Sequence, residues 1–67
     1  MATPSIGKRI RDRRRELDLS QNELAKKADI GWNSISTYER GTTIPTVPTM
    51  RKLADALNVT TDWLIYG

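Results

Sequence analysis

Two short helical patterns, separated by a three-residue break, constrain this fold more than any other feature of the chain. Apolar residues recur at helical spacing in both patterns: Leu24, Ala25 and Ala28 in the first, Ile35 and Tyr38 in the second. The break, residues 29–31, is too short to act as a linker, so the two helices must cross rather than continue. Ala25 suits such a crossing because a small side chain lets two helix backbones approach closely.

The second pattern predicts a helix over about residues 32–40 with an unusual outer face. On a wheel of about 100° per residue, Ile35 and Tyr38 lie on the inner side, with Ser34 and Glu39 at its edges. The opposite side carries Trp32, Asn33, Ser36, Thr37 and Arg40. This face begins at the helix N-terminus, where free backbone N–H groups can reach a phosphate. Its short amide and hydroxyl groups have the chemistry that reads base edges in the major groove of DNA.

The length and composition narrow the class of protein. A chain of 67 residues predicts one domain, and domains of this size depend on dense packing. The absence of Cys and His excludes a disulfide framework and Cys or His catalysis, and it argues against a bound metal. No apolar run approaches the ~20 residues of a membrane span and no secretory signal is visible, so we expect a cytoplasmic protein. We also expect no cofactor.

Positive charge is concentrated near the N-terminus. The net charge is only +3, but six of the eleven Lys and Arg residues fall within residues 8–15. They are Lys8, Arg9, Arg11, Arg13, Arg14 and Arg15. A basic block on one helix indicates a polyanionic partner, although a charge run taken alone is more often a solvated helix face.

The periodicity predicts an all-α domain of five short helices, with a flexible N-terminus over residues 1–4 and the domain over residues 5–67. The first helix is expected to start after Thr3 or Ser5 and to run to about Asp18, and the others are expected at about residues 21–28, 32–40, 47–57 and 61–66. N-cap residues are expected at the helix starts: Thr3 or Ser5, Ser20 with Glu23 completing a capping box, Thr46 and Thr60. Left-handed stops are expected at Gly41 and Asn58.

Apolar positions on these helices predict the core, and residues 42–45 carry no core signal. The expected core residues include Ile6, Ile10 and Leu17, then Val47, Met50, Leu53, Ala54 and Leu57, and finally Trp63, Leu64 and Tyr66. Ile65 lies on the other side of the last helix, where it is a candidate for a dimer contact. Arg13 falls within the first apolar stripe, where its stem can cover apolar surface while its head reaches water.

The chain contains LSQNELAKKADI followed directly by GWNSISTYERG, and then PTVPTMRKLADALNVTTDWL. These motifs resemble the Cro and lambda-repressor-like (XRE) helix-turn-helix family over about residues 5–67. The resemblance implies a compact five-helix lambda-repressor-like fold, in which about residues 32–40 form the recognition helix. Three positions depart from the family pattern: Asp18 and Asp29 stand where Gly is common, and Gly31 where Ser or Thr often caps.

The resemblance also implies a function. It implies a transcription regulator, most often a repressor, that binds a palindromic double-stranded DNA operator as a homodimer. Carried over by position, the expected base contacts are Trp32, Asn33, Ser36 and Thr37. The expected phosphate contacts are Gln21, Ser34 and Arg40, with Arg11 and Arg14 added from the basic helix. Arg14 is further expected to form a structural ion pair with Glu39.

Each of these assignments competes with a plainer one. Trp32 can pack on the preceding helix instead of contacting a sugar or a thymine methyl, and Ser36 and Thr37 can be ordinary solvated residues. A protein-interaction module, with the basic helix serving solubility, competes with the regulator. An enzyme ranks third, because the sequence shows no paired carboxylates, nucleophile–base set or phosphate-binding loop.

Overall fold

The computed structural model describes residues 6–67. This part of the chain contains five helices joined by turns and loops, and it contains no strand. The helices are α1 (Ile6–Glu16), α2 (Gln21–Ala28), α3 (Trp32–Arg40), α4 (Val47–Leu57) and α5 (Thr61–Tyr66). The predicted all-α class is confirmed, as are the bounds of α2, α3 and α5. The predicted flexible segment and the caps Thr3 and Ser5 lie outside the described residues.

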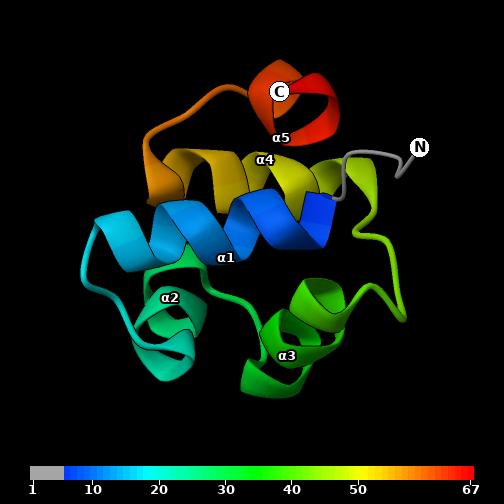
Figure 1. Ribbon diagram of the computed structural model, residues 1–67. Helices are drawn as coiled ribbons and strands as arrows, with labels where there is room; N and C mark the ends of the chain where they lie inside the picture. The colour runs from blue at the N-terminus through cyan, green and yellow to red at the C-terminus, as the bar shows by residue number, and fades with distance from the viewer. Residues whose placement is uncertain (1–5) are drawn as a thin grey trace.

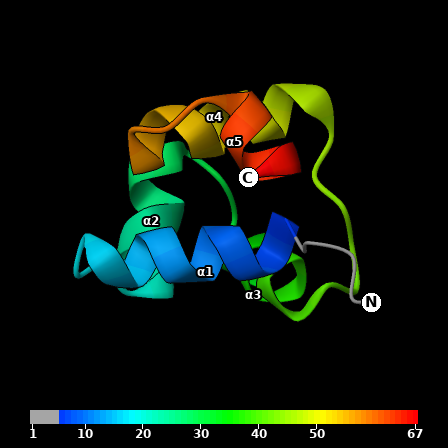
Figure 2. The ribbon, with the colours of Figure 1, turned by 45° about the horizontal axis from the view of Figure 1, so that its top comes forward.

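The helix α1 runs through the middle of the molecule (Figure 1). It packs against α3 on one side and against α4 and α5 on the other, while α2 packs against both α3 and α4. In Figure 2 the helices α2 and α3 lie at opposite ends of α1. The pair α2 and α3 therefore forms one face of the molecule, with α4 and α5 at its back.

Six side chains at the centre are completely buried: Ile10, Leu24, Ile35, Leu53, Leu57 and Leu64. They come from all five helices, so one core holds the whole domain together. Burying a side chain of this size contributes about 1.5–3 kcal/mol, and such residues dominate the stability of a small domain. Ala25 is buried as well, as the predicted close crossing of α2 and α3 requires.

Most of the predicted helix ends are confirmed. The Ser20 hydroxyl accepts the Glu23 N–H at 3.0 Å, and the Glu23 carboxylate accepts the Ser20 N–H at 2.8 Å, which completes the capping box. The Thr60 hydroxyl accepts the Trp63 N–H at 3.0 Å. Gly41 and Asn58 both adopt the left-handed conformation. Thr46 stands at the start of α4, but its hydroxyl donates to the Thr49 hydroxyl instead of accepting a backbone N–H.

The first helix ends earlier than predicted, at Glu16 rather than near Asp18. Asp18 has a φ of 56°, and the N–H of Leu19 donates back to the carbonyl of Arg14 at 3.0 Å. This left-handed turn closes the helix in the way that a C-terminal glycine usually does. Asp18 thus fills the backbone role of the glycine that it replaces in the family pattern.

The packing at the start of α4 differs from the prediction at one residue. Val47 was expected in the core, but it is 67% exposed, whereas Pro45 in the preceding loop is buried. Val47 lies on the same helical stripe as Met50, but Val47 is the first residue of α4 and stays exposed, whereas Met50 is buried. Pro45 is thus buried although residues 42–45 carry no core signal in the sequence.

The last helix is oriented differently from the prediction. Leu64 is completely buried and Trp63 is half-buried, but Tyr66 is 75% exposed rather than in the core. Ile65, the candidate for a dimer contact, is partly buried and packs against the core. Because successive helical residues are about 100° apart, Tyr66 lies about 200° around the helix from Leu64 and faces away from the core.

Candidate nucleic-acid interface

The turn between α2 and α3 depends on one left-handed residue. Asp29 has φ 57° and ψ 50°, and the following Ile30 N–H donates to the Ala25 carbonyl at 2.9 Å. These values match the turn that glycine usually makes, and Asp tolerates this conformation better than most residues. Gly31 then begins α3 in an extended conformation, without a side-chain hydrogen bond to the helix. The first turn of α3 therefore keeps backbone N–H groups that no capping side chain occupies.

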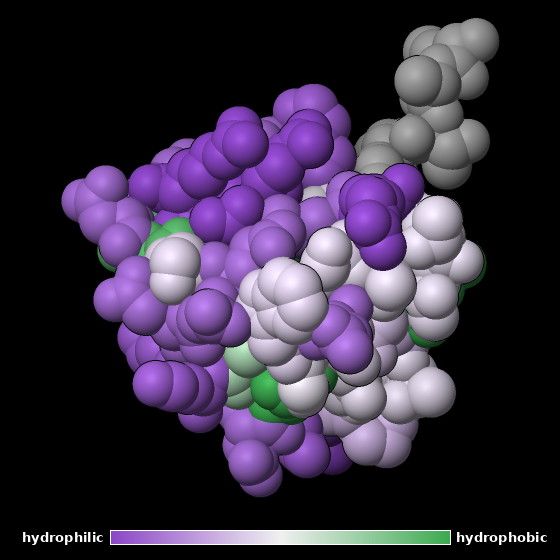
Figure 3. All heavy atoms as spheres, turned by 90° about the horizontal axis from the view of Figure 1, so that it is seen from below, coloured by the Kyte–Doolittle hydropathy of each residue, from purple (hydrophilic) through white to green (hydrophobic). Residues whose placement is uncertain are grey.

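The outer face of α3 starts directly at this turn. Trp32 is 51% exposed, Asn33 and Arg40 are exposed, and Ser36 and Thr37 are half-exposed. Figure 3 shows the molecule from the side on which α2 and α3 lie; strongly hydrophilic side chains gather along the left and the top of this view, and paler side chains cover its centre and right. The structure thus places the four predicted base-contacting residues on one open helix. Whether they contact bases stays a prediction.

Trp32 does not close against α2. A shallow hollow of about 580 Å³ lies between it and the second half of α2, and it is lined by Asn22, Ala25, Lys26, Asp29, Ile30, Gly31 and Trp32. The indole therefore stands on the open side of the turn, free to contact a surface that approaches α3. Half of the Trp32 surface is exposed, and its contact with DNA stays a prediction.

The hydroxyl of Thr37 is already used inside the protein. It donates to the Ser34 carbonyl at 2.9 Å, and the Thr42 hydroxyl donates to the Thr37 carbonyl at 3.1 Å. The Thr37 oxygen keeps its acceptor capacity and its methyl group, whereas its hydrogen is committed. Thr37 is therefore suited to accept a hydrogen bond from a base or to contact a methyl group.

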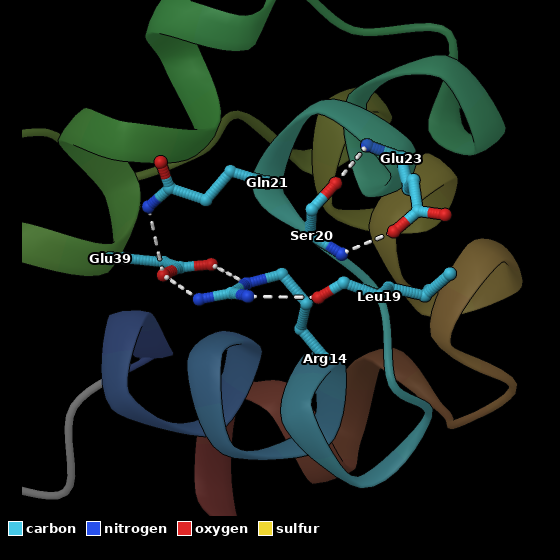
Figure 4. Close-up of polar contacts among 6 residues, drawn as sticks. All are labelled: Arg14, Leu19, Ser20, Gln21, Glu23 and Glu39. Carbon is cyan, nitrogen blue, oxygen red and sulfur yellow. Dashed lines mark hydrogen bonds and ion pairs between the residues drawn. The ribbon is translucent and has the colours of Figure 1, made fainter.

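A buried ion pair joins α1 to α3 directly behind this face. The Arg14 Nε atom lies 2.7 Å from Glu39 Oε2, and Arg14 Nη2 lies 2.9 Å from Glu39 Oε1 (Figure 4). The two side chains are only 11% and 4% exposed. The hydrogen bonds to the Glu39 carboxylate raise the pKa of the Arg14 guanidinium above its ordinary value. The structural pair predicted from the sequence is formed.

Arg14 also donates from Nη1 to the Leu19 carbonyl at 2.9 Å. All three of its guanidinium nitrogens are therefore engaged within the protein. Its charge lies near the surface that α2 and α3 share, but its hydrogen-bonding capacity is largely committed to holding α1, α3 and the α1–α2 turn together.

Gln21 at the start of α2 belongs to the same network. Its Nε2 atom donates to Glu39 Oε1 at 3.2 Å, and Figure 4 shows the amide reaching from α2 toward the carboxylate on α3. The second Nε2 hydrogen is not needed for this bond. The N–H groups of Gln21 and Asn22 have no acceptor within α2, as is general for the first turn of a helix. Gln21 thus combines an oriented amide with a free helix end, an arrangement that suits a phosphate.

The basic block on α1 has mixed roles that the sequence did not distinguish. Arg9 Nη1 donates to the carbonyls of Leu64 and Ile65 at 3.0 and 3.1 Å. Arg13 Nε donates to the Leu57 carbonyl at 2.9 Å, so its head does not simply reach water as predicted. Both arginines satisfy carbonyls at the C-terminal ends of helices, where a positive charge is favourable. The position of Arg13 within the apolar stripe was the one sequence signal of such a role.

The remaining basic residues of α1 are more open. Lys8 pairs with Asp12 at 2.7 Å on the surface, and Arg15 is exposed. Arg11 is half-buried, and within residues 6–67 its buried Nε atom has no hydrogen-bond partner. Fewer of the six basic side chains of α1 are therefore available to bind another molecule than their number in the sequence suggested.

Neither a metal site nor a membrane helix is visible in the described part of the chain. Residues 6–67 contain no cluster of three or more Asp, Glu, His or Cys side chains that could hold a metal ion. None of the helices formed by these residues is both long and apolar enough to cross a bilayer.

Comparison with known proteins identifies the family. A family model described as helix-turn-helix matches residues 10–64 of the chain. The chain belongs to the helix-turn-helix family. The resemblance to its XRE branch is confirmed, since the relatives of this helix-turn-helix domain include a bacterial transcriptional regulator and a phage repressor.

Two relatives illustrate the similarity. The domain is 41% identical over 61 residues to the HTH-type transcriptional regulator ImmR of Bacillus subtilis, and this alignment covers 91% of this chain and 48% of ImmR. It is 36% identical over 67 residues to repressor protein C2 of Salmonella phage P22, and this alignment covers the whole of this chain and 31% of C2. The chain thus spans about half the length, or less, of these relatives.

Solved structures agree with the fold. The P22 c2 repressor in complex with a synthetic operator superposes with a TM-score of 0.92 at 35% identity, covering 97% of this chain and 98% of that one. The biofilm regulator SinR in complex with DNA superposes with a TM-score of 0.84 at 35% identity, covering 88% and 95%. The predicted lambda-repressor-like fold is confirmed.

Proposed function

We propose that this domain is a sequence-specific double-stranded DNA-binding transcription regulator that acts in the cytoplasm. It acts as a repressor, binding a palindromic operator as a homodimer. In this proposal α3 enters the major groove and reads base edges, while side chains beside it hold the backbone.

The carrying observation is the open outer face of α3 next to the N-terminus of α2. The exposed Trp32 and Asn33 lie in the first turn of α3, where uncapped N–H groups are also available. Gln21 is linked to α3 through Glu39, so the first turn of α2 is held at a defined position beside that face. Side chains that can contact bases and N–H donors that can bind phosphates thus lie next to each other on one surface.

We assign roles to the site residues from this geometry. The base contacts are Trp32, Asn33, Ser36 and Thr37, and the phosphate contacts are Gln21, Ser34, Arg40 and Arg11. Arg14 has its nitrogens committed to Glu39 and Leu19, so we assign it the structural pair, with its charge adding to the field at the backbone. The operator and DNA complexes of the P22 c2 repressor and SinR support the use of this fold on DNA.

Selection of bound duplexes from a random pool tests the proposal. We expect an enriched site with two inverted half-sites whose centres are about one helical turn, ~34 Å, apart. Affinity for that site should also fall steeply with salt, because phosphate contacts release counterions. An unenriched pool, or equal affinity for selected and random duplexes at moderate salt, would contradict the proposed function.

A further inference from the structure

Two neighbouring residues of α3 carry hydroxyl groups that the fold uses differently. Ser36 and Thr37 are both half-exposed on the outer face of this helix. The Thr37 hydroxyl lies 2.9 Å from the Ser34 carbonyl oxygen. The Ser36 hydroxyl, by contrast, makes no hydrogen bond within residues 6–67. The two side chains therefore offer different groups to a molecule that approaches α3.

The direction of the Thr37 hydrogen bond follows from its two partners. A carbonyl oxygen can only accept, and a hydroxyl group has a single hydrogen, so this hydrogen points at Ser34. The Thr37 oxygen is left with acceptor capacity alone, beside the methyl group of the side chain. Among the hydroxyls of this face, Thr37 is thus an acceptor and Ser36 is both donor and acceptor.

The backbone of Thr37 is fixed as well. The N–H and the hydroxyl of Thr42 both donate to the Thr37 carbonyl at 3.1 Å. Gly41 lies between them with a φ of 79°, and this left-handed residue lets the chain fold back over the last turn of α3. Thr37 is therefore held by the preceding turn through its side chain and by the following turn through its carbonyl.

The four bases differ in what they present to such a side chain in the major groove. Adenine and cytosine each present an amino group that donates, and thymine presents a methyl group that can contact the Thr37 methyl. Guanine presents only the acceptors N7 and O6. A guanine that packs against Thr37 loses the water that donates to these atoms and gains no donor in return, which is unfavourable for any polar group.

We propose that Thr37 excludes guanine from the base that it faces in each half-site and admits adenine, cytosine or thymine there. This inference rests on the proposed function. Ser36 imposes no such exclusion, because its hydroxyl is free to donate to guanine as well as to accept from the other bases. Two hydroxyl residues that look interchangeable in the sequence thus have different effects on the choice of operator.

Binding to single-base variants of the selected duplex tests the exclusion. The position that Thr37 faces is the one at which Thr37→Ala changes the order of base preference. Guanine at this position should weaken binding of the parent on the order of tenfold. In Thr37→Ala this loss should largely disappear, because the smaller side chain leaves room for a water molecule that donates to guanine. Melting temperatures should stay close to that of the parent, since Thr37 is half-exposed and Ala favours a helix.

Thr37→Ser separates the two groups of the side chain. It keeps the hydroxyl and should still reject guanine at the same position. It lacks the methyl group and should therefore bind thymine there less tightly than the parent does. Equal rejection of guanine by the parent and Thr37→Ser, together with its relief in Thr37→Ala, is the result that assigns the exclusion to the hydroxyl.

Ser36→Ala is the matched control. It removes the neighbouring hydroxyl and should relieve no loss that is specific to guanine. Tight binding of the parent to guanine at the Thr37 position overturns the exclusion, as does a loss with guanine that persists in Thr37→Ala or that Ser36→Ala relieves instead. If a site is enriched but Thr37→Ala alters no position, Thr37 reads no base and only this inference fails. If no duplex is enriched, the proposed function fails as well.

Discussion

Arg14 and Glu39 meet through a two-pronged contact between α1 and α3, with nitrogen–oxygen distances of 2.7 and 2.9 Å. The same carboxylate accepts the amide of Gln21 from α2 at 3.2 Å. One buried side chain thus connects the first three helices. The buried Glu39 carboxylate thus ties α3 both to α1 and to the first turn of α2.

Replacing Glu39 with Gln should be strongly destabilising. The variant leaves the Arg14 guanidinium buried without its counter-charge, which typically costs about 3–5 kcal/mol. Urea unfolding measures the loss. The matched control is Asp12→Asn, which removes the partner of Lys8 from a solvent-exposed pair and should change stability much less. Equal losses in the two variants would show that burial does not decide the strength of these pairs.

Replacing Gly7 with Ala should also destabilise the domain. A Cβ atom at this position overlaps the Tyr38 carbonyl oxygen and lies 3.1 Å from the Glu39 Cα, so α1 and α3 must separate. Ala is favoured over Gly within a helix by about 1 kcal/mol, but overpacking of a close contact costs about 1–3 kcal/mol. We therefore expect a net loss in urea unfolding. The control is Gly31→Ser, which has open space and should gain a few tenths of a kcal/mol as a better cap. A more stable Gly7→Ala variant would contradict the close approach.

Replacing Asn33 with Ala should weaken binding to the selected duplex and relax the preference at one base pair. The exposed amide in the first turn of α3 can bridge an adenine, and losing such a contact costs about 1–3 kcal/mol. Titrations against the selected duplex and its single-base variants measure this effect. An equal loss on selected and random duplexes would assign Asn33 to the backbone instead.

Replacing Gln21 with Ala should weaken binding to selected and random duplexes by about the same factor. A phosphate contact carries no sequence information, and its removal also lowers the dependence of affinity on salt. Binding at several salt concentrations measures both quantities. A loss confined to the selected duplex would contradict a phosphate role for Gln21.

The capping box should make a small part of the folding stability depend on pH in the acidic range. The N–H of Ser20, followed by its hydroxyl, lowers the pKa of the Glu23 carboxyl below its usual value of 4.5. Because this pKa is lower in the folded state, the stabilisation is fully present above 4.5 and is lost as the pH falls through the folded-state pKa. The melting temperature of the parent should exceed that of Glu23→Gln at neutral pH, and the difference should shrink in acid. A difference that stays constant with pH would argue against the charged cap.

The sequence predicted the parts of the site that depend on nearby residues. The spacing of Leu24, Ala25 and Ala28 indicated the buried face of α2, and all three are buried. The family resemblance added the pairing of Arg14 with Glu39, which spacing alone had indicated only in part. The link from Gln21 to Glu39 was not anticipated, because it requires the two helices to be placed against each other.

The sequence by itself determined most of the helix ends, because capping boxes, left-handed stops and apolar spacing act between residues a few positions apart. Only the tertiary structure decided which residues of the basic block serve the protein's own interior. Arg9 and Arg13 donate to carbonyls 55 and 44 positions further along the chain. Likewise, whether Pro45, Val47 and Tyr66 are covered depends on what packs over them, and local periodicity contains no information about that distant surface.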